Sequence, residues 1–332
     1  MSDARTKRIL VSGLLAAVLA VTALTTGCSK GAASASTESG GGTSSAKGPT
    51  VIRLPNTLSD LALIADKKGF FAEENVKIEW TGQQAHGPAN IVSIVAGQND
   101  AGVSIDTAIF DAVAKGGKLK LVASTQNSPI ITWLVLDKSS VKTPEDLLGK
   151  KVAGQSSTIT WYPLVKYLSD KGRDYNDIEF VTVPMPQQEQ ALRSGQVAAI
   201  ATGEPFTSQI LKNGGVRKLI DDYQVIGINK IGGWAFSQKF IDENPDAVRG
   251  FTKALQKTVA WATENDANFQ EAVAIDKAAG GYSFSKDWDP TLAIDEQDVA
   301  KWAELLKKYG DPKAGGVDLS SVYTNEFNDA AK

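Results

Sequence analysis

The chain has 332 residues, a length that two domains of ordinary size would use, and its 42% hydrophobic content does not fit an intrinsically disordered chain. It carries 35 Lys and Arg and 38 Asp and Glu; the first 27 residues hold three basic residues and one acidic residue, so the remainder carries 32 and 37. This mild acidity does not favour nucleic-acid binding, which needs a clustered basic surface.

The N-terminus has the pattern of a secretory signal. Three basic residues come first, a mostly apolar run covers residues 9–24, and small residues lead to Cys28. The apolar run is short for a membrane span, which needs roughly 20 apolar residues. Cys28 is the single cysteine, so no internal disulfide can form. An uncleaved anchor helix with a buried thiol is the alternative interpretation.

The segment around Cys28 resembles a bacterial lipobox, in which the preceding peptide is removed and the cysteine is acylated. One departure is that Thr25 stands where lipoboxes usually have a leucine, and Leu24 lies one place earlier. Residues 29–50 are rich in Ser, Gly, Ala and Thr, a composition typical of a flexible tether. We therefore expect a signal peptide and lipidated cysteine over residues 1–28, and a protein anchored to the extracytoplasmic face of the cell membrane. That face is the periplasmic side where the envelope has two membranes.

After the tether, short apolar strands alternate with helical segments, which predicts an α/β fold with mainly parallel sheets. In the first part we expect strands over residues 51–54, 76–80, 103–105, 119–124 and 131–136. Helices are expected over residues 58–68, 89–96 and 108–114. Pro88 in a first helical turn and Gly97 as a stop mark the second of these helices.

From Thr143 the pattern begins again and predicts a second α/β lobe. A short helix is expected to start there, with threonine as cap and Pro144 at its first position. The next elements are expected as strands over 151–153, 178–183 and 197–202 and helices over 158–170 and 187–193. A strand over 233–237, a long amphipathic helix over 245–265 and a helical tail around Trp302 follow. Two similar lobes predict a ligand site in the crevice between them, beyond the carboxyl ends of the strands.

The chain lacks the residues that common catalytic centres need. A zinc site takes three or four His, Cys or acidic ligands, whereas this chain has one histidine, His86, and one cysteine. The phosphate-binding pattern G-x-x-x-x-G-K-[ST] does not occur, and residues 154–157 lack the second glycine of a serine elbow. We expect no metal, no cofactor and no enzymatic activity.

Four segments, taken in their order and spacing, show a family resemblance. They read LALIADKKGFF at 61–71, GPANIVSIVAGQNDAGVSIDTAI at 87–109, QALRSGQVAAIATGEPF at 190–206, and continue over 233–261. The folded body resembles the ABC-importer binding proteins for aliphatic sulfonates, taurine and nitrate, and their relatives for thiamine precursors.

The resemblance implies an α/β, two-lobed type II periplasmic-binding-protein fold with two hinge crossovers, near residues 137–141 and 225–231. Lobe 1 would then comprise residues 51–138 and 231–332, and lobe 2 residues 139–230. Such proteins close over their ligand like a hinge.

Helix N-termini hold anions without a basic side chain, because their N–H groups are unpaired and carry a partial positive charge. Two such starts would face the cleft, and their residues are His86, Gly87 and Pro88 in lobe 1 and Ser156, Ser157 and Thr158 in lobe 2. Further polar or aromatic residues would follow strands or line the walls in the family arrangement. These are Asn56, Thr57, Asp106, Thr107, Gln126, Glu204 and Trp234.

Structural roles remain the alternative for several of these residues. Helix capping suits Ser157, Thr158, Asp106 and Glu204. His86 also fits a surface or packing role, and Trp234 fits core packing. Relatives often have a tryptophan where this chain has Gly203.

Two acidic residues and the absence of arginine from the candidate loops indicate the chemical class of the ligand. Asp106 and Glu204 suit a zwitterion such as taurine, whose ammonium would meet an acid while its sulfonate meets a helix end. We expect a small sulfonate first, a thiamine-like pyrimidine or other heterocycle second, and nitrate or an aromatic acid after these.

We expect a monomer that passes its solute to an ABC permease and its ATPase. Two other classes are weighed: an enzyme related to pyrimidine synthases of thiamine assembly, whose cysteine-rich motif is absent here, and a surface adhesion lipoprotein.

Overall fold

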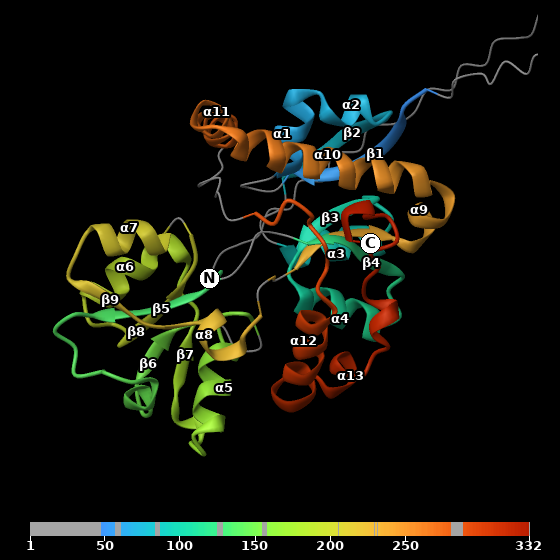
Figure 1. The fold of residues 1–332 in the computed structure, drawn as a ribbon. Coiled ribbons are helices and arrows are strands. Elements are labelled where there is room, and N and C mark those ends of the chain that lie inside the picture. Colours follow the sequence, from blue (N-terminus) through green and yellow to red (C-terminus); the bar gives the residue numbers. More distant parts are fainter. Residues whose placement is uncertain are drawn as a thin grey trace, which may run out of the picture. The chain divides into compact units, whose positions relative to one another are not determined.

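A computed structural model of the chain describes nine stretches (Figure 1). They are residues 48–56, 61–83, 87–124, 129–154, 158–204, 206–228, 230, 232–279 and 288–331. The signal peptide, Cys28 and most of the tether lie outside the described residues. So do five candidate site residues, which are Thr57, His86, Gln126, Ser156 and Ser157, and the side chain of Asn56.

The described strands form three sheets. In chain order the strands are β1 (Thr50–Asn56), β2 (Val76–Gln83), β3 (Ala101–Ser104), β4 (Leu119–Ser124), β5 (Thr132–Leu136), β6 (Lys151–Ala153), β7 (Glu179–Val181), β8 (Ala199–Thr202), β9 (Val216–Asp221) and β10 (Gly233–Ser237). The sheets have the orders β1-β2, β3-β10-β4 and β7-β6-β8-β5-β9.

Helices cover these sheets. Those before β8 are α1 (Leu61–Lys68), α2 (Phe70–Glu73), α3 (Gly87–Val95), α4 (Asp106–Ala114), the 3-10 turn η1 (Pro144–Leu147), α5 (Tyr162–Asp170) and α6 (Met185–Arg193). Those after it are α7 (Phe206–Lys212), α8 (Asp222–Ile226), α9 (Gln238–Glu243), α10 (Pro245–Glu264), α11 (Asp266–Ala278), α12 (Glu296–Tyr309) and α13 (Pro312–Gly315).

The prediction of mainly parallel sheets is wrong. Parallel pairing occurs in β1–β2, β6–β7 and β6–β8, but β10 runs antiparallel to both β3 and β4, and β5 runs antiparallel to both β8 and β9. β5 follows a segment that leaves the three-stranded sheet, and β10 follows a segment that leaves the five-stranded sheet, so no helical crossover within one sheet sets the direction of either strand. The pairing register shifts after Trp133 in β5 and after Trp234 in β10, at the second residue of each strand.

β5 belongs to the five-stranded sheet, although the sequence prediction assigned residues 51–138 to lobe 1. That assignment is wrong for this strand because Thr132 pairs with Thr202 of β8 and with Asp221 of β9. The first change of sheet therefore lies between the end of β4 and Thr132, ahead of the predicted crossover at 137–141. The return lies between the end of α8 and the start of β10.

β5 contributes to two cores because successive side chains of a strand point to opposite faces. Trp133 and Val135 join the cluster that contains residues of α5 and α12. Leu134 joins a smaller cluster with Leu192 of α6 and Ile210 of α7. The five-stranded sheet is thus packed on both faces.

α10 holds the smaller sheets together (Figure 1). It packs against α1, α2 and β4. Phe251 on its buried face stacks on Phe71 of α2, with ring centroids 5.2 Å apart, and meets Trp234 of β10 edge-on at 6.5 Å. One aromatic side chain therefore connects α2 to the centre of the three-stranded sheet.

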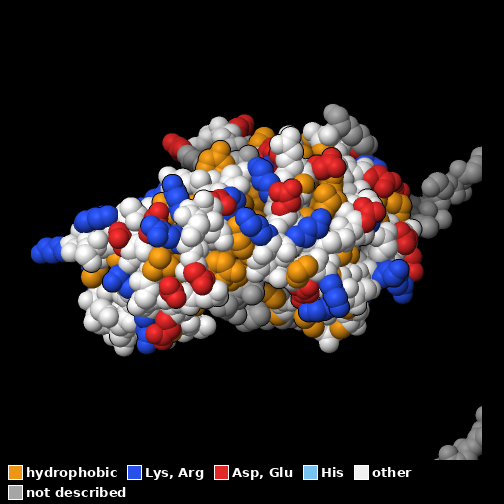
Figure 2. All heavy atoms as spheres, turned by 90° about the horizontal axis from the view of Figure 1, so that it is seen from below, with side chains coloured by type: hydrophobic (Ala, Val, Ile, Leu, Met, Phe, Trp, Pro, Cys, Tyr) orange, Lys and Arg blue, Asp and Glu red, His pale blue; other side chains and the backbone are white. Residues whose placement is uncertain are grey.

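The described surface mixes both signs of charge. On the face shown in Figure 2, Lys and Arg side chains are interspersed with Asp and Glu, with apolar side chains between them. The described part of the chain contains no helix with the length and apolar character of a transmembrane span.

Candidate ligand site

Two serine hydroxyls flank Gly233 in the three-stranded sheet. Gly233 of β10 is paired with Ser104 of β3 on one side and with Ser124 of β4 on the other. Both serines are buried, with 5% and 1% of their surface exposed, and neither hydroxyl has a hydrogen-bond partner among the described residues. Buried polar groups are nearly always hydrogen-bonded, so these two hydroxyls are candidate contacts for a bound molecule.

The first turn of α3 lies against one of these serines. A Cβ atom on Gly87 would lie 2.9 Å from Ser104 Oγ and 3.1 Å from Ser104 Cα, so a side chain there would force the helix start away. The first N–H groups of a helix have no intrahelical partner and carry the positive end of the helix dipole. Of the predicted residues here, Gly87 is half-buried beside Ser104 and Pro88 is exposed.

Asp106 is the first residue of α4, and its carboxylate is only 3% exposed. Its Oδ2 accepts a hydrogen bond from the backbone N–H of Gly232 at 2.5 Å. Burial raises the pKa of Asp106 to about 7, the hydrogen bond from Gly232 works in the opposite direction, and the negative charge of Asp298 adds to the rise. Thr107 beside it is also buried. The carboxylate of Asp106 therefore fastens the chain just ahead of β10.

Thr158 does not cap α5. The N-cap position of that helix is Trp161, so the helix begins later than the predicted residue 158. The residues before it form a turn in which the Trp161 N–H donates to the Thr158 carbonyl at 2.9 Å. The Thr158 hydroxyl lies 2.8 Å from that of Thr160. Contact of Thr158 with a ligand stays a prediction.

Glu204 and Trp234 have structural roles that agree with the alternatives given above. Glu204 is exposed, and its Oε2 accepts from the backbone N–H of Ser208 at 3.2 Å in the first turn of α7. Trp234 is 1% exposed and lies between Phe251 and Trp288, with ring centroids 6.5 and 6.0 Å away. Its Nε1 has no hydrogen-bond partner among the described residues, so a ligand contact through that atom stays a prediction.

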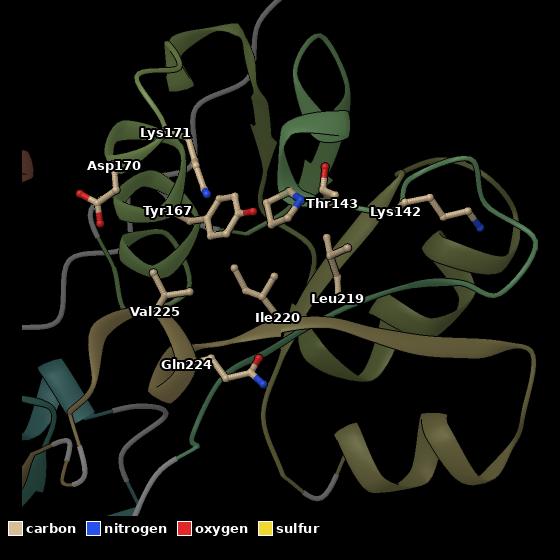
Figure 3. Close-up of a pocket in the computed structure, with 10 residues that line it drawn as sticks. Lys142, Thr143, Tyr167, Asp170, Lys171, Leu219, Ile220, Gln224 and Val225 are labelled. Atoms are coloured by element: carbon tan, nitrogen blue, oxygen red, sulfur yellow. The ribbon is translucent and has the colours of Figure 1, made fainter.

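A cavity of about 440 Å³ lies between η1, α5, β9 and α8 (Figure 3). Tyr167 of α5 and Lys171, just after that helix, form one wall, and Leu219, Ile220 and Val225 form the opposite one. None of the predicted site residues that the structure describes lines this cavity. Within the described residues, no three His, Cys, Asp or Glu side chains gather where a metal ion could be held.

Sequence reasoning missed Ser104 and Ser124. Both are ordinary strand residues, and they become neighbours only through β10, which lies more than a hundred residues further along the chain. The consecutive glycines Gly232 and Gly233 are the one local signal, because they allow a close approach of backbones. A Cβ on Gly233 would overlap the carbonyl oxygen of Ala123.

Residues 58–268 match the family model described as NMT1/THI5 like, and this match covers more than half of the chain. The chain belongs to this family. A taurine-binding periplasmic protein from Escherichia coli (strain K12) is 27% identical over 262 residues, which cover 69% of this chain and 81% of that protein. A relative from the same organism, provisionally named an aliphatic sulfonates-binding protein, is 27% identical over 207 residues and 61% of this chain. That match spans 64% of the relative, less than two thirds of its length.

Solved structures confirm the fold class expected from the sequence. The periplasmic aliphatic sulphonate binding protein SsuA from Escherichia coli superposes with a TM-score of 0.66 at 20% identity, over 80% of this chain and 88% of that chain. The desulfurization enzyme DSZB superposes with a TM-score of 0.59 at 15% identity, over 85% and 98%. The chain has the mixed α/β fold of type II periplasmic binding proteins. Because an enzyme shares this fold, fold alone does not separate binding from catalysis.

Proposed function

We propose that this protein is the extracytoplasmic solute-binding component of an ABC importer and that its ligand is a small sulfonate. The hydroxyls of Ser104 and Ser124 carry this proposal, because neither has a hydrogen-bond partner among the described residues and Ser104 lies beside the first turn of α3. A sulfonate group presents three acceptor oxygens and one negative charge, so it would accept hydrogen bonds from both serines and from helix N–H groups. The names of the taurine-binding and sulfonates-binding relatives support the same ligand class.

In this proposal the protein recognises its ligand through the sulfonate group. Asp106 and Glu204, the acids expected to meet an ammonium group, are both engaged by backbone N–H groups of Gly232 and Ser208. Taurine and simple alkanesulfonates are therefore equal candidates. The bound solute would pass to an ABC permease and its ATPase, and the protein would act as a monomer.

Isothermal titration calorimetry with a panel of small molecules tests the ligand class. The panel is taurine, ethanesulfonate, nitrate, a hydroxymethylpyrimidine and benzoate. We expect both sulfonates to bind and the other three to give no heat above dilution. Binding of the pyrimidine or nitrate in place of the sulfonates would contradict the proposal. Mass spectrometry of the recovered ligand should show it unchanged, and a converted product would replace the binding function with an enzymatic one.

Replacement of Ser104 or Ser124 by alanine separates a ligand contact from a structural role. Each variant should bind ethanesulfonate about tenfold or more weakly, because a hydrogen bond to a charged group contributes about 1.5 to 3 kcal/mol. The ligand-free variants should be as stable as the parent or more stable, because each change removes a buried hydroxyl that no other described residue hydrogen-bonds. Ser320→Ala, at an exposed position, is the control. A parallel loss of stability and affinity, or an unchanged affinity, would refute the assignment.

We further propose that Cys28 is acylated and anchors the protein through the tether. The support is the position of this single cysteine after a basic start and an apolar run. Cells that express the protein with radiolabelled palmitate should label the parent chain and leave the Cys28→Ser variant unlabelled. Equal labelling of the two would exclude the anchor.

A further inference from the structure

The chain changes sheet twice. We call these segments the first connection, of which the structure describes residues 129–131, and the second connection, of which it describes residues 227, 228, 230 and 232. The first leads from β4 to β5, and the second leads from α8 to β10. The strands that they enter, β5 and β10, each run antiparallel to both of their neighbours in the sheet. Any change in the angle between the three-stranded and the five-stranded sheet must be taken up along these two connections.

A buried aspartate holds the described end of the first connection. Asp222, 1% exposed at the start of α8, accepts backbone N–H groups of Ile130 and Ile131 on Oδ2 at 3.1 and 3.2 Å. Its own N–H donates to the Ile131 carbonyl at 3.1 Å, and its Oδ1 accepts from the Tyr223 N–H at 2.9 Å. One side chain therefore fixes two consecutive residues of the first connection to the helix from which the second connection leaves.

Two further buried aspartates hold the second connection, and they come from different helices. Asp106 of α4 accepts the N–H of Gly232 at 2.5 Å, and Asp298 of α12 accepts the N–H of Lys230 at 3.0 Å. The side chain of Lys230 binds Asp289 and donates to the carbonyl of Ala293 at 2.8 Å. The backbone N–H groups of Lys230 and Gly232 thus both donate to carboxylates that lie far away in the sequence.

The charged groups around these carboxylates are few among the described residues. Asp298 faces Asp106, and Lys301 of the same helix lies 3.4 Å from Asp298 and donates to the Gly227 carbonyl. Asp221 faces Asp222 and is itself paired with Lys218 of β9.

We propose that Asp222, Asp106 and Asp298 are positioning residues that fix the described parts of both connections, and that protonation of Asp222 and Asp106 loosens these parts and weakens ligand binding. The effect on ligand binding rests on the proposed function, whereas the fixing of the connections does not. A carboxylate accepts a hydrogen bond roughly twice as strong as a neutral acceptor does, so loss of the charge weakens each backbone contact without removing it.

The pH range follows from burial. Burial raises the pKa of Asp106 to about 7 and that of Asp222 to about 6, each from an ordinary value of 3.8. In the unfolded chain both groups lose their protons near pH 4, so the folded state holds protons more tightly between about pH 4 and 7. The free energy of unfolding should therefore decrease as the pH rises through this range and stay low above it. The hydrogen bonds between these carboxylates and the connections respond to pH in the opposite direction to the free energy of unfolding. They are strongest above pH 7, where both carboxylates are charged.

Backbone hydrogen exchange measured by NMR on the ligand-free protein tests the fixing directly. In the parent, the protection factors of the Gly232, Ile130 and Ile131 amides should be about tenfold lower at pH 5 than at pH 8. Asp106→Asn should lower the protection of Gly232 at pH 8 and remove its pH dependence, and Asp222→Asn should do the same for Ile130 and Ile131. Each variant should also be more stable than the parent at pH 8, because it removes a buried charge. If the two aspartates had only a structural role, the Asn variants would show lower protection factors together with a lower free energy of unfolding.

Asp276→Asn is the matched control. Asp276 in α11 is also 1% exposed with a pKa raised by burial, but its Oδ2 has no hydrogen-bond partner among the described residues. This variant should gain stability at pH 8 and leave protection in both connections unchanged.

Calorimetry with ethanesulfonate supplies the functional measurement. Asp222→Asn and Asp106→Asn should weaken binding at pH 8 by about 2- to 30-fold, and parent binding should weaken between pH 8 and pH 5. Protection factors at these amides that depend neither on pH nor on the aspartates would overturn the inference. If the amides respond as expected and no sulfonate binds, the fixing of the connections is supported and the proposed function fails.

Discussion

Replacement of Gly232 by alanine is expected to lower the free energy of unfolding by about 2 to 5 kcal/mol. Gly232 has a φ of +82°, a region that residues with a Cβ atom rarely adopt. An added Cβ would overlap the carbonyl oxygen of Ser104 and lie 2.6 Å from the Cα of Ile105, which are backbone atoms that cannot rotate away. Urea denaturation followed by circular dichroism would measure the loss.

Gly172→Ala is the matched control for this prediction. Gly172 has a φ of +67°, but a Cβ there would have no heavy atom within 4 Å. It should lose only about 1 kcal/mol, the cost of the backbone conformation alone. Equal losses at the two glycines would show that the close approach at Gly232 does not matter.

Replacement of Trp302 by alanine should cost about 3 to 5 kcal/mol, the range for large aromatic side chains removed from a core. Trp302 of α12 is fully buried and meets Tyr162 of α5 edge-on, with ring centroids 5.8 Å apart. The contact links α12 to α5, a helix packed on the five-stranded sheet. Thermal and urea unfolding would both show the loss.

Two further variants make the Trp302 prediction specific. Trp302→Phe keeps an aromatic ring at the contact and should lose less than Trp302→Ala. Val92→Ala removes apolar atoms from a side chain that is 69% exposed and should change stability by less than about 0.5 kcal/mol. An unfolding midpoint of Trp302→Ala within error of the parent would contradict the packing described here.

The local part of the fold could be predicted from the sequence where apolar runs are short and clearly bounded. The strands at 119–124, 151–153 and 233–237 have the predicted bounds. β9 and α11 were both missed. β9 lies at the edge of its sheet and carries Arg217 and Lys218, and α11 buries only Ala272 and Asp276 of its thirteen residues. Neither has the periodic apolar pattern on which prediction depends.

Strand direction and sheet membership could not be predicted in the same way. The sequence around β5 shows an apolar run, but the partners of Thr132 are 70 and 89 residues away, at Thr202 and Asp221. Those pairings decide that the strand belongs to the second sheet and runs antiparallel within it. No local pattern contains that information.

The candidate site residues divide in the same way, into features visible in the local sequence and contacts between distant residues. Gly87 was identified because a helix start is visible in the sequence, and Asp106 because it follows a strand. The partner of Asp106 is Gly232, 126 residues away, and the partners of Asp222 are about 90 residues away. The backbone contacts of these carboxylates therefore became visible only with the fold.

The place of β10 between β3 and β4 constrains the order in which the protein can fold. The three-stranded sheet cannot assemble until residues 233–237 lie between β3 and β4. All five strands of the other sheet, β5 to β9, stand between β4 and β10 in the sequence. Contacts across so long a stretch form slowly, since the closure of a long loop precedes the pairing that stabilises it. The three-stranded sheet is therefore expected to form after the five-stranded one, although β3 and β4 precede that sheet in the sequence.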